Sequence, residues 1–307
     1  MDERECRDGV RRKQCYIMMD ILSSFSFQIV AIGTMILAFA CGVIGTINVL
    51  RQNSLIGDAI GHAQFPGVVL AFMIVGTLDA LSLLIGALIF GAFAFFVIQM
   101  INQYSKISLD ASLALVLSSF FGFGMTLKSY VQGSSAYGHT GGIDDYIFGQ
   151  AAYMLRADVN IILIVSAISL LIFIFNYQRI KIFIFDPVYS HMIGNKPTVM
   201  NALILVMTIG LIAAGLKAVG VILIVNLLIA PGVIGLMWSK RYLYVTLIAG
   251  FSGLVSAFVG TYISTAYVGF ATGPTIILCL SAIVLFSILF GTHGAVRNGL
   301  MRRRHAA

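Results

Sequence analysis

The sequence predicts an all-α protein that crosses a membrane eight or nine times, and three observations lead to this fold class. The 307 residues are 59% hydrophobic and only 10% charged, with a mean hydropathy of +0.99. Soluble domains carry roughly a quarter of their residues as charges, so a soluble class is excluded. Apolar runs of the length that a helix needs to cross the hydrocarbon core recur along the chain. The ionisable residues gather between these runs.

Nine apolar runs are long enough to be crossings, and most of the connectors between them are short and polar. We expect crossings at 27–50, 55–76, 80–101, 109–127, 159–177, 199–216, 219–238, 243–268 and 273–292. Two connectors are long, at 128–158 and 178–198. Glycines at four-residue spacing inside the runs predict helices that approach one another closely.

The positions of Lys and Arg orient the predicted bundle, because basic residues are retained on the cytoplasmic side of a membrane. Eleven of the fourteen bases after residue 20 lie in alternate connectors or at the C-terminus. This places the C-terminus in the cytoplasm and, with nine crossings, the N-terminus outside. The net charge of +7 is therefore an orientation signal, and we expect no nucleic-acid partner.

The chain divides into a polar tail at 1–20, a transmembrane domain at 21–296 and a basic cytoplasmic tail at 297–307. Arg11, Arg12 and Lys13 would prefer the cytoplasm, which conflicts with an outside N-terminus. Either there are eight crossings, or the natural start is Met18 or Met19 and the preceding residues are an upstream mis-start or a cloning remnant. We expect the second explanation.

The second predicted crossing contains an Asp–His pair, Asp58 and His62, inside an apolar run. Ionisable residues in hydrocarbon are costly and usually face a partner or a wet cavity. Positions i and i+4 of a helix lie on one face, so a carboxylate oxygen and an imidazole nitrogen can meet at one point. Oxygen with imidazole and no sulfur suits Mn²⁺, Fe²⁺ or Zn²⁺. Two such helices at a dimer axis would supply four ligands.

A structural explanation of the same pair remains open at this point. Asp58 lies about one turn inside the predicted crossing, where a carboxylate complements the dipole of a helix N-terminus. His62 would then be only its neighbour. The residues by themselves do not choose between a metal site and a helix-end interaction.

The long connector on the basic side contains the segment Asp186 to Gly194. Asp186 followed by Pro187 is a helix-start signal, and Gly194 suits the C-terminal end of a short helix. This helix of under two turns is either a surface turn or a docking element for a cytoplasmic partner.

The sequence carries no signature of an enzyme within its 307 residues. It has no GxxxxGK[ST] phosphate-binding loop, HExxH, hydrolase elbow or CxxC pair. The four cysteines indicate neither a disulfide framework nor a thiolate metal site, and no covalently bound cofactor is expected. If ATP drives transport by this chain, another polypeptide must hydrolyse it.

Four stretches resemble the membrane permease of metal-ion ABC importers, the family that takes up manganese, zinc or iron with a cluster-9 binding protein. They are Ser54 to Gly67, Gly142 to Gln150, Asp186 to Gly194, and Val219 to Pro231. The resemblance extends from about Met19 to Gly291, and the Asp-x-x-x-His element followed by Pro-Gly is its specific part.

The resemblance implies a homodimer with the type II importer fold in a bacterial inner or plasma membrane. Its partners would be cytoplasmic ABC ATPase subunits, an extracellular or periplasmic metal-binding protein and membrane lipid. Asp58 and His62 would form the metal site, and Asn226 and Gln64 are candidates for lining the path. The coupling helix near 186–194 would include Asp186, Pro187, Met192 and Gly194.

The resemblance also implies the cargo. The form Phe148-Gly149-Gln150 is more similar to the manganese branch than to the zinc branch. The predicted function is therefore ATP-driven import of divalent metal, Mn²⁺ first and Zn²⁺ or Fe²⁺ as alternatives, by alternating access. The alternative from another class is a secondary transporter or channel for a cation that works without an ATPase. A membrane scaffold, in which the pair is dispensable, is a further alternative.

Overall fold

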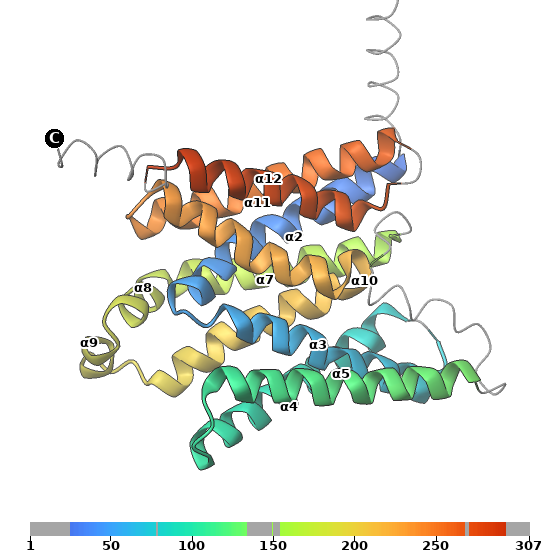
Figure 1. Cartoon of the computed structure of the whole chain (residues 1–307), viewed down its shortest axis with the longest axis horizontal. Coiled ribbons are helices and arrows are strands. Elements are labelled where there is room, and N and C mark those ends of the chain that lie inside the picture. Colours follow the sequence, from blue (N-terminus) through green and yellow to red (C-terminus); the bar gives the residue numbers. More distant parts are fainter. Residues whose placement is uncertain (1–24, 78, 134–148, 150–153, 268–269, 293–307) are drawn as a thin grey trace, which may run out of the picture.

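Every regular element in the described part of this chain is a helix (Figure 1). The computed structural model describes residues 25–77, 79–133, 149, 154–267 and 270–292. The helices are α2 (Phe25–Leu50), α3 (Ser54–Val75), α4 (Ala80–Tyr104), α5 (Leu109–Gly133), α7 (Arg156–Phe175), α8 (Tyr177–Phe185), α9 (Pro187–Met192), α10 (Pro197–Trp238), α11 (Tyr242–Ala266) and α12 (Thr272–Phe290). Eight of these are long and apolar enough to cross a membrane. The predicted all-α, multi-pass class is confirmed.

Helix α10 is two helices joined at a break. Its 42 residues would span about 63 Å if straight, roughly twice the hydrocarbon thickness. Gly220 has φ +78° and ψ 164°, a conformation that glycine adopts at little cost and other residues avoid. Methyl groups of Ile212 and Val225 both lie within 3.7 Å of the position that a Cβ on Gly61 would take. In a straight helix these two residues would be about 20 Å apart, so the chain reverses at the break.

The two halves of α10 correspond to the predicted runs 199–216 and 219–238. Figure 1 shows the second half returning beside the first. With α10 contributing two crossings, the eight long helices of the described residues account for all nine predicted runs. The predicted boundaries agree with the helix ends to within a few residues, apart from the last six residues of α5.

Helix α8 was missed, because 178–185 was treated as part of a connector. Its nine residues, YQRIKIFIF, alternate buried Ile180 and Phe183 with exposed Arg179 and Lys181. Nine residues make only about two and a half helical turns, which is shorter than the window of 11 or more residues over which an apolar periodicity is recognised. The sequence therefore predicted one short helix in this connector where the structure has two.

The basic connectors lie at one end of the bundle, as the charge pattern predicted. The α2–α3, α4–α5 and α10–α11 connectors lie at the same end as α8 and α9, on the left of Figure 1. Asp79, Asp158 and Lys217 belong to the opposite end. The tails 1–20 and 297–307 lie outside the described residues, as does 142–150 except for Gly149.

Two groups of helices share α10 as a common wall. Helix α2 packs against α7, α10 and α11, while α3 packs against α4 and α5. The main core joins buried residues of both groups through α10. A smaller apolar cluster fills the space between α3, α4 and α5, and includes Ala59, Ala94 and Leu113. Helix α3 is therefore packed against its neighbours on one side. Its other side carries Asp58 and His62.

Candidate metal site

Asp58 and His62 lie one turn apart on α3, and their side chains approach each other. His62 Nε2 is 3.5 Å from Asp58 Oδ1. Two ligands that bind one ion at about 2.1 Å, at angles between 90° and 109°, are about 3.0–3.4 Å apart. The observed separation therefore needs only a small adjustment for both atoms to bind the same divalent ion.

The imidazole of His62 is held on its other side by an aromatic ring of α5. Phe121 contacts it edge-on, with ring centroids 5.0 Å apart and an interplanar angle of 83°. His62 Nδ1 is buried and has no hydrogen-bond partner in the described ranges. The ring is thus positioned by packing, with Nε2 directed towards Asp58.

The helix-end explanation of Asp58 finds no support in the contacts. Asn53 occupies the N-cap position of α3. Within the described part of the chain, the Asp58 carboxylate makes no hydrogen bond to a backbone N–H, and its partner is His62. The side chains of Asp58 and His62 are 36% and 22% exposed. A carboxylate this open in an apolar helix requires a wet path or another subunit to cover it.

One subunit supplies an incomplete ligand set. Among the described residues, no three His, Cys, Asp or Glu side chains lie close enough together to hold one metal ion. The pair therefore offers one oxygen and one nitrogen, while stable transition-metal sites use four or more ligands. Additional ligands must therefore come from outside the described residues, such as water or a second chain.

The two candidates for lining the path occupy different positions. Gln64 is completely buried, and its Nε2 donates to the Ile209 carbonyl oxygen at 3.2 Å, while its Oε1 has no partner among the described residues. It lies about 200° around α3 from His62, so it points into the bundle. Asn226 is half-buried, one turn after Ile222, which is 58% exposed. Asn226 thus lies on an outward face of the second half of α10, the half whose Val225 contacts Gly61 of α3.

The predicted short helix near 186–194 is present as α9. The Asp186 carboxylate accepts a hydrogen bond from the Tyr189 N–H at 2.9 Å, and Pro187 is the first helical residue. The helix ends at Met192, and Gly194 follows with φ +89°. Met192 is 77% exposed. Helix α9 therefore presents an apolar surface at the basic end of the bundle.

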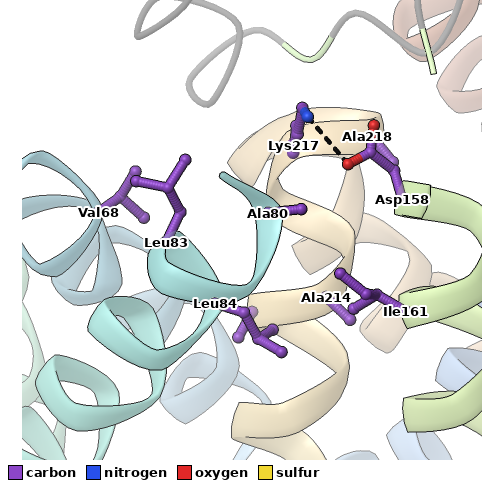
Figure 2. Close-up of a pocket in the computed structure, with 10 residues that line it drawn as sticks. Val68, Ala80, Leu83, Leu84, Asp158, Ile161, Ala214, Lys217 and Ala218 are labelled. Carbon is purple, nitrogen blue, oxygen red and sulfur yellow. Dashed lines mark hydrogen bonds and ion pairs between the residues drawn. The ribbon is translucent and has the colours of Figure 1, made fainter. Parts of the chain in front are cut away.

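An ion pair at the opposite end escaped the sequence analysis. Figure 2 shows Lys217 of α10 reaching across to Asp158 of α7, with Nζ 2.9 Å from Oδ1. The other carboxylate oxygen accepts from the Leu155 N–H at 3.1 Å. Asp158 is 5% exposed and Lys217 is 28% exposed. This pair fixes the first half of α10, just before the break, to the start of α7.

We expect Lys217→Met to destabilise the protein by about 2–3 kcal/mol. Removing one partner of a fully buried pair costs about 3–5 kcal/mol, and the partial exposure of Lys217 reduces this. Thermal unfolding in detergent measures the effect, with Lys106→Met, an exposed lysine without an ion pair in the described chain, as the control. Adding Asp158→Asn should recover part of the loss, and no recovery would contradict the pairing.

The break in α10 is also contacted by Gly149. Gly149 has φ +72°, and a Cβ on it would overlap the Val219 carbonyl carbon and the Gly220 nitrogen. In the sequence, Gly149 falls within the long connector predicted at 128–158. The structure places this residue directly against the reversal between the two halves of α10.

The family follows from comparison of the whole chain with known proteins. A family model described as the ABC 3 transport family matches residues 24–291. The chain belongs to this family. It is accordingly a membrane component of an ABC transporter and a multi-pass bacterial membrane protein.

Curated relatives agree with this family assignment. The manganese transport system membrane protein MntC of Bacillus subtilis is 38% identical over 85% of this chain, which spans 60% of that relative's length. The zinc transport system membrane protein TroC of Treponema pallidum is 34% identical over 95% of this chain and 98% of its own.

A solved structure has the same fold. PsaBC from Streptococcus pneumoniae, in complex with Fab, superposes with a TM-score of 0.82 over 94% of this chain and 99% of that chain, at 24% identity. This similarity confirms the permease fold that the resemblance implied.

Proposed function

We propose that this ABC 3 family member is the permease subunit of an ATP-driven importer of divalent transition metal ions. The observation that carries the proposal is the carboxylate and imidazole pair, 3.5 Å apart on a partly open face of α3. The similarity to membrane proteins of manganese and zinc transport systems supports it. Mn²⁺ is the first candidate for the cargo, because hard oxygen and borderline nitrogen donors without sulfur suit it, with Zn²⁺ and Fe²⁺ as alternatives.

A homodimer would complete the ligand set. A two-fold axis beside α3 would bring Asp58 and His62 of two copies together, giving two oxygens and two nitrogens around one ion. The partial exposure of both side chains in a single chain supports this arrangement. Such a site binds the ion transiently, because few charged ligands and no thiolate allow release.

The energy for import would come from separate ATPase subunits on the cytoplasmic side. Helix α9 would dock into them, through the exposed Met192 and its neighbours, with Asp186, Pro187 and Gly194 setting its start and end. An extracellular or periplasmic metal-binding protein would deliver the ion to the opposite end. ATP-driven closure of the ATPases would then exchange outward-open and inward-open states of the path.

Reconstitution tests this function and separates it from a cation channel or secondary transporter. Proteoliposomes containing the chain together with its ATPase and binding protein should accumulate ⁵⁴Mn²⁺ only when ATP is supplied. Proteoliposomes containing the chain alone should show no uptake with either a pH gradient or a metal gradient. Gradient-driven uptake by the chain alone would refute the importer and favour the secondary transporter or channel.

A further inference from the structure

A second feature of the structure lies away from the Asp58–His62 pair. An apolar cavity of about 340 Å³ lies between α2, α7 and α11. Phe39 and Val43 of α2 line it together with Leu170 of α7 and Leu247 of α11. Helices α7 and α11 both pack on α2, which separates them at this point. The result is a groove between two membrane-spanning helices.

The groove opens onto an exposed apolar surface of the bundle. Ile174 and Leu243, which line it, are 64% and 50% exposed, and Phe251 on α11 is 57% exposed. Large apolar side chains exposed on spanning helices face acyl chains. The groove belongs to helices other than α3 and α5, which carry the Asp58–His62 pair and its aromatic neighbour. A chain-like apolar molecule from the bilayer therefore fits its shape and surroundings.

One end of the groove is polar. Tyr177, the first residue of α8, lines the groove at the basic end of the bundle, where its ring stacks on Tyr242 with centroids 5.4 Å apart. The Tyr177 hydroxyl has no hydrogen-bond partner in the described part of the chain. Burial raises the pKa of Tyr177, so the hydroxyl remains a protonated donor.

Basic residues adjoin this polar end in the sequence. Lys181 lies one turn after Tyr177 on the same face of α8, Arg179 also belongs to α8, and Arg241 directly precedes the Tyr242 that stacks on Tyr177. All three bases are exposed, and none forms an ion pair with a described residue. Uncompensated Lys and Arg next to the membrane surface attract anionic headgroups. The groove and these charges match the two ends of an anionic lipid.

We propose that this groove binds an anionic phospholipid of the cytoplasmic leaflet. One acyl chain occupies the space above Phe39 and Val43, and the phosphate lies near Lys181 and Arg241. The Tyr177 hydroxyl donates a hydrogen bond to an ester or phosphate oxygen. Because Tyr177 begins α8 and α8 leads directly into α9, the bound lipid supports the position of the helix at the cytoplasmic surface.

Quenching of a single tryptophan by brominated lipid tests the site. Trp238 is the only tryptophan of the 307 residues, so Trp238→Phe gives a protein without tryptophan fluorescence. In that background, Leu243→Trp reports on the groove. Leu289→Trp on α12 is the matched control, because both leucines lie near the basic end of a helix and are 50% and 46% exposed. The protein is placed in phosphatidylcholine nanodiscs with increasing fractions of dibrominated phosphatidylglycerol.

We expect half-maximal quenching of the groove reporter at a mole fraction of dibrominated phosphatidylglycerol at least about fivefold lower than for the control, since each basic residue near the surface contributes about that factor. Lys181→Gln with Arg241→Gln should move the groove curve onto the control curve. Lys196→Gln, at an exposed base between α9 and α10, should leave it in place.

Three results would overturn the proposal. Coincident curves for the two reporters would show no site. Equal quenching of the groove reporter by dibrominated phosphatidylcholine would show that charge plays no part. A reporter that neither lipid quenches would indicate cover by protein, such as a second copy. Thermal unfolding of the Lys181→Gln, Arg241→Gln variant verifies that it is folded.

Discussion

Asp58→Ala and His62→Ala should each reduce ATP-driven metal uptake by a factor of about 100 or more in proteoliposomes that contain the complete transporter. Even outer-shell partners of metal ligands cost 10–100-fold when removed, and a direct ligand should cost at least as much. Each substitution leaves one donor per subunit. In the proposed homodimer, two copies then provide two donors, too few to replace the hydration that the ion loses.

The same variants separate a metal site from a structural role. Asp58 makes no hydrogen bond to a described backbone group, and both side chains are partly exposed. Their removal should therefore change the thermal midpoint by only a few degrees and leave ATPase association intact. Asp110→Ala, at an exposed aspartate in the first turn of α5, is the matched control and should transport normally. Near-normal uptake by both Asp58→Ala and His62→Ala would refute the site.

Gly45→Ala should be among the most destabilising single substitutions in this chain. Gly45 of α2 faces the backbone of the second half of α10, and a Cβ on it would overlap the Leu228 carbonyl oxygen and lie 2.7 Å from the carbonyl carbon. Both partners are helical backbone, so no flexible side chain can move aside. Overpacking of a tight core costs about 1–3 kcal/mol, and backbone displacement places this site at or above the upper end.

Gly122→Ala is the matched control for Gly45→Ala. Gly122 lies within α5, and a Cβ on it would have no heavy atom within 4 Å. Alanine is also the better helix former, so this variant should be as stable as the parent or slightly more stable. Thermal unfolding and the yield of monodisperse protein in detergent measure both variants. Equal stability of the two would contradict the close backbone contact between α2 and α10.

The membrane spans could be predicted because their signal is local. A run of about twenty apolar residues is long enough and apolar enough to cross the membrane as a helix, whatever the rest of the chain does. The positions of the basic residues indicate which connectors lie at the same end. The sequence predicted two crossings, 199–216 and 219–238, where the structure has α10, although the break itself lies at Gly220, two residues beyond the predicted interval. Helix α8 carried too short a pattern to be recognised in the same way.

The side-chain environment of the site could be predicted only in part. The approach of Asp58 to His62 follows from helical geometry, so the sequence was sufficient for it. The burial of Gln64 against α10 was not predictable, because it depends on which face of α3 meets the other helices. The roles of Gln64 and Asn226 in a path remain predictions.

The sequence by itself determined the class of this protein, the limits of its crossings, the shared end of its basic connectors and the pairing of Asp58 with His62. Each of these depends on residues within one helix or on composition. Only the tertiary structure decided that Lys217 pairs with Asp158 across 59 positions of sequence, that Gly149 meets the reversal in α10, and that a groove opens between α7 and α11. These features arise where helices distant in the chain pack together, and no local pattern encodes which faces will meet.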